Sequence, residues 1–300
     1  MSEPQALATE PRITTEVRDH VLLIGLNRPK KKNAFDLQML DEYAAAFVEL
    51  ERNPELRVGL VFAHGSDFTA GLDLANVGPA VAAGKNLFPD GAIDPFRMHE
   101  PFGRKPVIGA AHGLCLTIGI EMLLSFDIRL AAEGTRFGQI EIKRGIFPFG
   151  RATFRWVANC GWGNAMRYLL TADELDAAEA YRIGLVQEVV APDKLLARAL
   201  ELAHRVAAQA PLGVMETLIN ARLSVEAAER AAVAELMPAV RRIMNTEDAS
   251  EGVASFLERR TGNFKGRDLK TDADFVAAVL GLFGGVLSTL TSGCVEPFFS

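Results

Sequence analysis

The stretch PVIGAAHGLCLTIGIEMLLSFDIRLA, residues 106–131, contains the alternation that indicates the fold class. Pro106–Ala111 is a short apolar run typical of a buried strand, Gly119–Phe126 predicts a short apolar helix, and Asp127–Ala131 predicts another strand. Strands that alternate with helices along a chain are typical of α/β architecture. We therefore expect an α/β core in which this stretch forms one strand–helix–strand unit.

The residues before this unit predict further elements of the same kind. They are a hairpin of two strands over residues 12–17 and 20–26, a helix over residues 36–52 and a buried strand over residues 57–63. Residues 77–105 are irregular and rich in Gly and Pro. A loop of this length in a compact domain is more often functional than accidental, so we expect it to form a mobile wall of a site.

After Pro192 the composition changes to long helical stretches rich in Ala, Leu and Glu. Helices are expected over residues 194–208, 212–232, 233–244 and 247–260. This change predicts four parts: an N-terminal tail of residues 1–11, a core of residues 12–192, a helical part of residues 193–270 and an apolar tail of residues 271–300.

Two features of the termini bear on location. The first ten residues have neither a basic region nor an apolar run, so no signal peptide is expected. Residues 275–295 carry no charge, but their Gly, Ser and Thr content makes them a weak membrane span. We expect an extension that packs loosely or is disordered, and a membrane anchor is the less favoured alternative.

The overall charge and the cysteines exclude several classes of protein. A net charge of −6 does not suit a nucleic-acid-binding protein, which needs clustered Lys and Arg. Cys115, Cys160 and Cys294 are odd in number and far apart, so neither a disulfide framework nor a zinc site is indicated. A cytoplasmic location is expected. There is no G-x-G-x-x-G after a strand, no H-E-x-x-H and no P-loop, so no metal or dinucleotide is expected.

Glu121 is the only ionisable residue in the apolar run of residues 116–124. A buried carboxylate is costly without partners. In isolation, a Glu in the first turn of a helix is usually there to complement the helix dipole. However, a helix that begins near Gly119 also directs free N–H groups outward, and such groups suit a developing oxyanion. Glu121 is therefore a candidate for chemistry.

Two other segments carry weaker signals. In residues 137–145, Ile140 and Ile142 would share one face of a strand and Glu141 the other, which by itself describes an ordinary half-exposed residue. In residues 68–74, the chain turns at Gly71, which could bring a backbone N–H close to a ligand. In isolation this segment is better interpreted as a strand-to-helix turn capped by Asp73.

Together these segments resemble the crotonase family, the enoyl-CoA hydratase/isomerase superfamily. The resemblance runs in order from about residue 12 to 267. It is carried by residues 26–30 (LNRPK), 33–34 (NA), 68–74 (FTAGLDL), 105–108 (KPVI), 112–113 (HG), 119–121 (GIE), Asp127, 137–143 (FGQIEIK), 145–148 (GIFP), 178–180 (AEA) and 184–186 (GLV). The resemblance implies a crotonase-like ββα spiral core followed by a helical C-terminal part that assembles trimers or hexamers.

The resemblance also implies a site. The oxyanion hole of the family falls on the backbone N–H groups of Leu72 and Ile118, and its two catalytic carboxylates fall on Glu121 and Glu141. The CoA-binding positions fall on Lys30, Ala70, Leu72, Asp73 and Lys265. No cofactor is implied, because coenzyme A is part of the acyl-CoA substrate.

Two departures from the family pattern affect specificity. Ile118-Gly119-Ile120 stands where the family often has three glycines, which could narrow the oxyanion loop. Pro148-Phe149-Gly150-Arg151-Ala152 replaces the usual Pro-Gly-x-Gly-Gly. Phe149 and Arg151 are therefore candidates for lining an altered acyl pocket.

The expected function is an enoyl-CoA hydratase of acyl-CoA metabolism that adds water to a 2-enoyl-CoA thioester. A double-bond isomerase is the nearest alternative, but it needs one carboxylate, and both are present here. A crotonase-fold binding protein without turnover is a second alternative, since fold does not fix function. A serine hydrolase is not favoured, because Ser66 and Ser125 lie in no nucleophile elbow.

Overall fold

The structure is a computed structural model that describes residues 10–244 and 246–264. Of the sequence predictions, Lys265, the apolar tail of residues 271–300 and most of the N-terminal tail lie outside the described residues. The division of the chain into parts stays a prediction.

Two sheets form the centre of the molecule. The larger has the order β1-β2-β3-β4-β6-β9, and the smaller has the order β5-β7-β8. In the larger sheet β1 pairs with β2 antiparallel and the remaining pairs are parallel. The strands are β1 Ile13–Arg18, β2 Val21–Leu26, β3 Val58–Ala63, β4 Val107–Ala111, β5 Leu114–Leu116, β6 Ile128–Ala132, β7 Arg136–Gly138, β8 Glu174–Asp176 and β9 Glu188–Val190.

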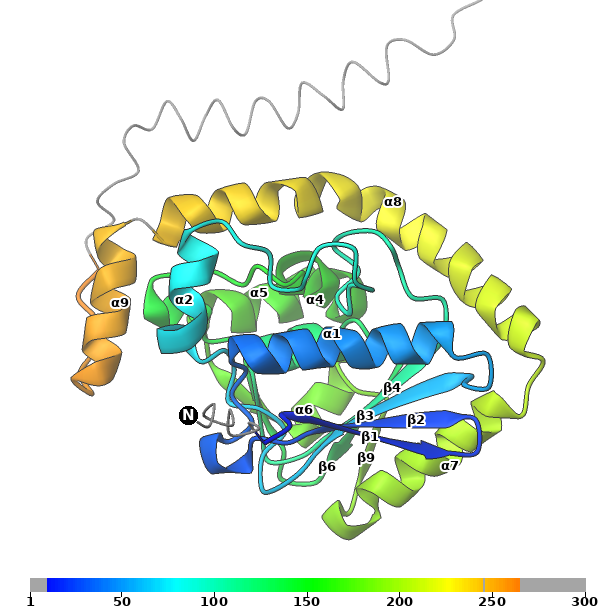
Figure 1. Cartoon of the computed structure of the whole chain (residues 1–300). Coiled ribbons are helices and arrows are strands. Elements are labelled where there is room, and N and C mark those ends of the chain that lie inside the picture. The colour runs from blue at the N-terminus through cyan, green and yellow to red at the C-terminus, as the bar shows by residue number, and fades with distance from the viewer. Residues whose placement is uncertain (1–9, 245, 265–300) are drawn as a thin grey trace, which may run out of the picture.

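Helices surround these sheets and connect their strands. The α-helices are α1 Leu37–Arg52, α2 Leu74–Ala82, α3 Ile118–Leu123, α4 Ala152–Cys160, α5 Trp162–Thr171, α6 Ala177–Arg182, α7 Leu195–Ala207, α8 Pro211–Met244 and α9 Glu247–Leu257. Three short 3₁₀ helices are η1 Pro29–Lys31, η2 Glu141–Arg144 and η3 Pro192–Lys194. Helix α1 begins after Asp36, whose carboxylate accepts from the Met39 N–H at 2.9 Å. It lies across the molecule between the sheet and α8 (Figure 1).

The larger sheet is covered on both faces, which explains its continuous apolar strands. All six residues of β2 are buried. Leu22, Ile24 and Leu26 point into the main core with α1 and α3, whereas Val21 and Leu23 pack with α7 on the opposite face. Because side chains alternate between faces, one strand serves both cores. Helix α7, which was expected in the C-terminal part, is thus packed against the core sheet.

The hairpin, the helix ending at Arg52 and the strand–helix–strand unit of the sequence prediction are confirmed. Two predictions were wrong in detail. The stretches expected as separate helices over residues 212–232 and 233–244 form the single helix α8. No residue that ends a helix stands at their junction, and Pro238 is accommodated inside α8. Residues 77–105 begin in α2 and are irregular only after it.

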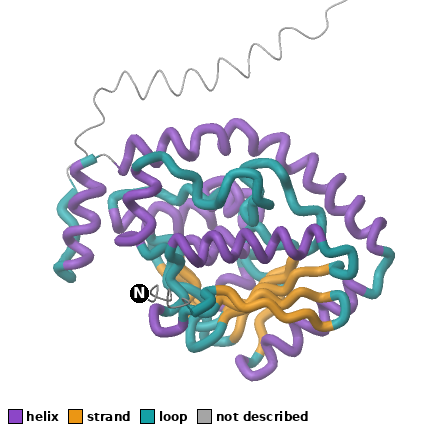
Figure 2. Tube along the Cα trace, viewed as in Figure 1, coloured by secondary structure: helices purple, strands orange, loops and turns teal. Residues whose placement is uncertain are grey.

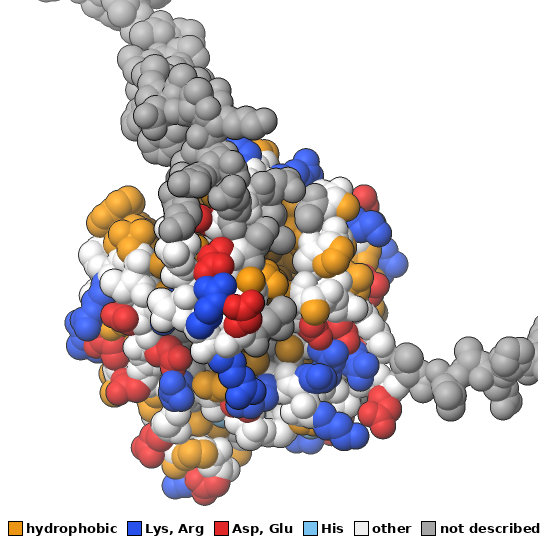
Figure 3. Space-filling model, turned by 90° about the vertical axis from the view of Figure 1, so that its left-hand side faces the viewer, with side chains coloured by type: hydrophobic (Ala, Val, Ile, Leu, Met, Phe, Trp, Pro, Cys, Tyr) orange, Lys and Arg blue, Asp and Glu red, His pale blue; other side chains and the backbone are white. Residues whose placement is uncertain are grey.

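Helix α8 arches over α4, α5 and the irregular chain that follows α2, and this loop lies between α8 and α1 (Figures 1 and 2). On the face that carries α2 and α9, acidic and basic side chains are interspersed (Figure 3). Over the described ranges, each helix is too short or too polar to cross a bilayer.

Candidate active site

Two loops are joined beside the smaller sheet. Thr69 pairs with Cys115 in an isolated parallel bridge: the Thr69 N–H donates to the Leu114 carbonyl at 2.9 Å, and the Leu116 N–H donates to the Thr69 carbonyl at 3.0 Å. This pairing holds the segment after β3 against the segment that enters α3. It therefore brings the predicted oxyanion positions onto neighbouring chains.

Gly71 allows these two chains to approach closely. Its φ is +108°, and a Cβ at this position would lie 2.4 Å from Thr117 Oγ1. Only glycine combines that conformation with that proximity. On the other side, Phe35 donates to the Gly71 carbonyl and accepts from the Asp73 N–H, at 2.9 and 2.8 Å. These bonds use the neighbours of Leu72, and in the described part of the chain nothing accepts from the Leu72 N–H.

The second N–H belongs to Ile118, the first residue of α3. The first N–H groups of a helix lack intrahelical acceptors, and no acceptor for the Ile118 N–H lies among residues 10–244 and 246–264. Thr117 before it has φ 50° and ψ −112°, a strained conformation for a β-branched residue. Strain of this kind persists where the surroundings fix the backbone, here through the Thr117 N–H donating to the Gly138 carbonyl at 2.9 Å.

Glu121 follows in the first turn of α3 and is only 5% exposed. Its Oε1 accepts from the N–H groups of Gly150 and Ala152, at 2.7 and 3.4 Å. Burial raises the pKa of Glu121 to about 7, although the two backbone hydrogen bonds oppose this shift. A Cβ on Gly150 would lie 2.3 Å from Glu121 Oε2, so a side chain there would displace the carboxylate.

Glu141 is 7% exposed and was predicted in a strand, which was wrong. Strand β7 ends at Gly138, Ile140 has left the extended conformation with ψ 14°, and Glu141 begins the 3₁₀ helix η2. The strand stops because its partners do: β5 ends at Leu116, opposite Gly138. The turn buries Glu141, which the half-exposed strand would not have done.

The surroundings of Glu141 differ from those of Glu121. Its Oε1 accepts from Gln139 Nε2 at 2.7 Å, and its buried Oε2 has no hydrogen-bond partner in the described chain. Burial, followed by the charge of Glu121, raises the pKa of Glu141 well above its ordinary value. The fold thus brings the two glutamates, twenty residues apart in sequence, within electrostatic reach of each other.

The predicted CoA positions lie around Leu72. Lys30 is exposed in η1, and the Ala70 N–H donates to the Lys32 carbonyl at 2.9 Å. Asp73 precedes α2 but makes no side-chain cap; its carboxylate instead pairs with Arg28 Nη1 at 3.0 Å. Contact between these residues and CoA stays a prediction.

The two candidates for the acyl pocket are both buried. Phe149 belongs to the main core. The Arg151 guanidinium is engaged by the carbonyls of Phe96 and Arg97 and by Glu229, so it is not a free cation. Whether an acyl group reaches either side chain stays a prediction. A cavity of about 800 Å³ is lined by Arg151 and by α8, but not by Glu121.

Sequence reasoning missed three residues of the site. Gln139, two residues before Glu141, carried a local signal that could have been used. Gly150 contributes only a backbone N–H, and Glu229 lies 78 residues from its partner Arg151, so neither carries a local signal. Among the described residues, no group of three or more His, Cys, Asp or Glu is placed to hold a metal ion.

Comparison with known proteins shows the family of the chain. The model of the enoyl-CoA hydratase/isomerase family matches residues 16–267. An enoyl-CoA hydratase of Mycobacterium tuberculosis is 33% identical over 261 residues, which cover 86% of this chain and 97% of that protein. The crotonyl-CoA hydratase of Syntrophomonas wolfei is 33% identical over 263 residues, covering 84% and 97%.

Solved structures give the same result. A probable enoyl-CoA hydratase/isomerase from Mycobacterium abscessus is 47% identical with a TM-score of 0.70, covering 85% of this chain and 99% of that one. A carnitinyl-CoA hydratase from Mycobacterium avium is 30% identical with a TM-score of 0.77, covering 86% and 100%. The chain therefore belongs to the enoyl-CoA hydratase/isomerase family, as its motifs indicated.

Proposed function

We propose that this protein is an enoyl-CoA hydratase that adds water across the double bond of a 2-enoyl-CoA thioester. The observation that carries the proposal is the pair of buried carboxyls, Glu121 and Glu141, whose surroundings favour different protonation states. Titratable groups whose environments separate their proton affinities are typical of acid–base sites.

In this mechanism the thioester oxygen accepts from the N–H groups of Leu72 and Ile118. Charge that develops on this oxygen makes the β-carbon electrophilic and gives the α-carbon enolate character. An oxyanion-hole donor typically contributes about 3 kcal/mol to transition-state stabilisation. Support for these donors comes from their lack of other acceptors in the described chain and from the loop pairing that fixes them.

The two carboxyls divide the proton transfers. Glu121, which accepts two backbone hydrogen bonds, is the ionised partner, and it takes a proton from water as the hydroxyl oxygen bonds to the β-carbon. Glu141, whose pKa is raised by burial and by the charge of Glu121, is the protonated partner and gives its proton to the α-carbon. Transfer of a proton from Glu121 back to Glu141 restores the starting state.

The finer features of the proposal rest on the family pattern. CoA is held by Lys30, Ala70, Leu72, Asp73 and Lys265, and the acyl group lies near Phe149 and Arg151. The chain acts as a trimer or hexamer in the cytoplasm. Support for assembly comes from large apolar side chains that are exposed on the C-terminal helices, namely Leu212, Leu223, Val225, Val253 and Phe256.

The test is turnover of a panel of 2-enoyl-CoA and 3-enoyl-CoA esters of several chain lengths by the purified full-length protein. A hydratase forms 3-hydroxyacyl-CoA from the 2-enoyl esters, and loss of the conjugated thioester absorbance follows the reaction. Conversion of 3-enoyl to 2-enoyl esters without hydration would identify an isomerase instead. Binding of the esters without conversion of either would favour a non-catalytic binding protein.

A further inference from the structure

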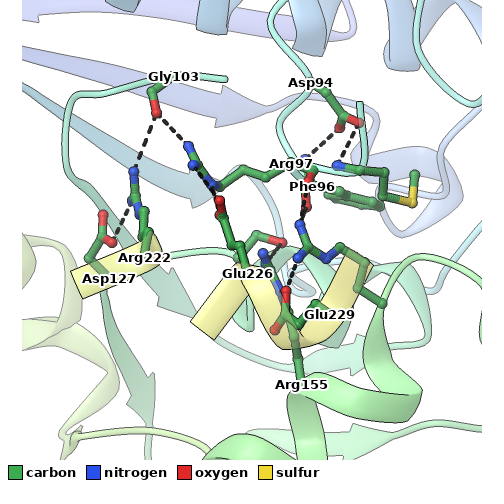
Figure 4. A network of polar contacts seen from close by, with 12 residues as sticks. Asp94, Phe96, Arg97, Gly103, Asp127, Arg155, Arg222, Glu226 and Glu229 are labelled. Atoms are coloured by element: carbon green, nitrogen blue, oxygen red, sulfur yellow. Dashed lines mark hydrogen bonds and ion pairs between the residues drawn. The ribbon is translucent and has the colours of Figure 1, made fainter. Parts of the chain in front are cut away.

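The middle of helix α8 contacts the chain beneath it through charged side chains. Arg222, Glu226 and Glu229 follow each other at spacings of four and three residues, so they lie on one side of the helix. Figure 4 shows all three directed at the chain beneath. Arg222 Nη2 pairs with Asp127 Oδ1 at 2.6 Å, and Glu226 Oε1 pairs with Arg97 Nε at 2.6 Å.

The third contact, between Glu229 and Arg151, is the most buried. The side chains are 8% and 2% exposed. Arg151 Nη1 also donates to the carbonyls of Phe96, at 2.9 Å, and Arg97. Burial lowers the pKa of Arg151 to about 10, so the guanidinium is charged at neutral pH. Breaking a buried ion pair by removing one partner typically costs several kcal/mol, because the other charge stays buried and unpaired.

The backbone of Arg151 is itself unusual. Its φ is +81° and its ψ is 3°, a left-handed conformation that favours glycine and is strained for another residue. Such a conformation persists only where the surroundings fix it. The contacts of its guanidinium with Phe96, Arg97 and Glu229 are added here to the backbone hydrogen bonds of Gly150 and Ala152.

This strained residue separates the two amides that hold Glu121. The Gly150 N–H precedes it and the Ala152 N–H follows it, and both donate to Glu121 Oε1. The ring of Phe96, whose carbonyl binds Arg151, packs over Gly150 beside the carboxylate. The contacts of the Arg151 guanidinium and the donors of Glu121 therefore belong to the same short turn.

Glu229 supports this region from a second direction. Arg155 Nε lies 3.8 Å from Glu229 Oε2, and Arg155 Nη1 donates to Ser125 Oγ at 2.7 Å and to the Leu124 carbonyl at 3.2 Å. Leu124 directly follows α3, the helix that carries Glu121. One carboxylate on α8 thus lies against both arginines of the α4 region.

We propose that Glu229, acting through the Arg151 guanidinium, positions the turn of residues 150–152 whose amides hold the Glu121 carboxylate. Helix α8 is then part of the frame of the active site, and Glu229, which is not a predicted substrate contact, is a positioning residue that acts through Arg151. The inference rests on the proposed function for the reaction it affects, but the placement of the carboxylate can be measured without turnover.

The expected effect follows from the charges around Glu121. The carboxyl of Glu141 faces it, and Asp94, Arg97, Arg155 and Glu226 surround Arg151. Removing the support of the turn weakens the two amide hydrogen bonds that lower the pKa of Glu121, whereas Glu141 stays in place. The pKa of Glu121 should then rise further, and the ionised form should become scarcer at neutral pH.

The test compares Arg151→Gly and Glu229→Gln with Arg222→Met in the full-length protein. Arg151→Gly removes the guanidinium and relieves the left-handed strain, and Glu229→Gln removes the charge with little change of volume. Arg222→Met is the matched control, since it breaks another ion pair between α8 and the core without contacting residues 150–152.

Two readouts separate the inference from the proposed function. In the pH profile of kcat/KM, the acid limb of Arg151→Gly and Glu229→Gln should move up by about half a pH unit or more. The value of kcat at neutral pH should fall about 10-fold or more in both, and KM should change little in Glu229→Gln, which alters no predicted substrate contact. The titration of the Glu121 carboxyl can also be measured without substrate, by infrared difference spectra of each variant against the same variant that also carries Glu121→Gln. These spectra should show the same upward shift of the Glu121 pKa.

In Arg222→Met, the Glu121 titration and the acid limb of the kcat/KM profile should be those of the unmodified protein, even if the variant unfolds more easily. The inference is overturned if Arg151→Gly and Glu229→Gln titrate like the unmodified protein, or if Arg222→Met shifts the titration equally. If Arg151→Gly does not fold, Glu229→Gln decides alone. A shifted infrared titration in a protein that hydrates no ester would uphold the inference and defeat the proposed function.

Discussion

Glu121 and Glu141 show how the same residue type acquires two different proton affinities within one site. Both are buried, which favours their neutral forms. Glu121 receives two backbone N–H groups, whereas Glu141 receives one side-chain amide and feels the charge of Glu121. The first proton lost by the pair therefore leaves mainly from Glu121, and the apparent pKa values belong to the pair.

Replacing either glutamate should remove most of the activity. We expect Glu121→Gln and Glu141→Gln each to lower the hydration rate at least about 100-fold, because general acid–base groups typically contribute that much. Affinity for CoA esters should change little, since neither side chain is a predicted CoA contact. Steady-state kinetics with ester binding by calorimetry checks both statements. Normal hydration by Glu141→Gln would defeat the two-carboxylate mechanism.

Glu121→Gln should also stabilise the folded protein at alkaline pH. The pKa of Glu121 is about 7 in the folded protein and near 4.5 in the unfolded chain, so its ionisation opposes folding increasingly as the pH rises from 4.5 to 7. The full effect, present above pH 7, is about 3 kcal/mol. Urea unfolding should find Glu121→Gln more stable than the unmodified protein at about pH 8 and nearly equal at about pH 4. Equal stability at both pH values would contradict the raised pKa.

At the scale of elements, the site depends on the loop that ends in Leu72 and on the start of α3. Strain at Thr117 and the proximity of Gly71 to Thr117 Oγ1 are features of this junction and of neither element alone. The junction orients backbone groups, so a substitution there should lower the reaction rate more than it lowers the stability of the fold.

Gly71→Ala tests the junction. The new Cβ would overlap Thr117 Oγ1 and displace the Leu72 N–H, so kcat should fall about 100- to 1,000-fold, as for loss of an oxyanion donor. Gly134→Ala is the matched control: its φ is +78° but its Cβ would meet nothing within 4 Å, so it carries the conformational strain without the overlap. Kinetics of both variants, with thermal unfolding, separates the two effects. A similar loss of rate in both would refute the special role of the junction.

The elements that the sequence predicted well are those with their own hydrophobic period. Residues 21–26 are apolar throughout because both faces of β2 are covered, and residues 37–52 repeat apolar side chains at helical spacing. Glu141 was wrongly predicted in a strand because Ile140 and Ile142 on either side of it give the alternating pattern of a strand. Strand pairing ends at Gly138, which depends on the tertiary structure and not on the local sequence. The backbone donors Leu72 and Ile118 came only from the family resemblance, since no side-chain pattern marks an N–H group.

At the scale of the whole molecule, the inner face of α8 could not be predicted from its own sequence. Arg222, Glu226 and Glu229 at helical spacing are typical of a solvated face. Their partners Asp127, Arg97 and Arg151 come from three distant segments that only the fold brings together (Figure 4). Leu212, Leu223 and Val225 of the same helix are nevertheless exposed.

These exposed apolar side chains lead to the last prediction, which concerns assembly. Exposed apolar side chains also occur on α9, where Val253 and Phe256 are open to solvent, and single chains rarely expose many such groups on neighbouring elements. We expect the full-length protein to form trimers or hexamers at micromolar concentration, and Leu223→Glu, which adds a charge to this surface, to weaken them.

Light scattering coupled to size-exclusion chromatography measures the mass of both proteins. Lys194→Glu in the short helix η3, which packs against α7, is a control with a charge change on another element. Burying a leucine against a partner contributes about 2 kcal/mol to the free energy of association. In a symmetric assembly Leu223→Glu changes every equivalent contact, so the loss of association free energy should be multiplied. If the unmodified protein elutes strictly as a monomer, the exposed apolar side chains of α8 and α9 do not mediate assembly.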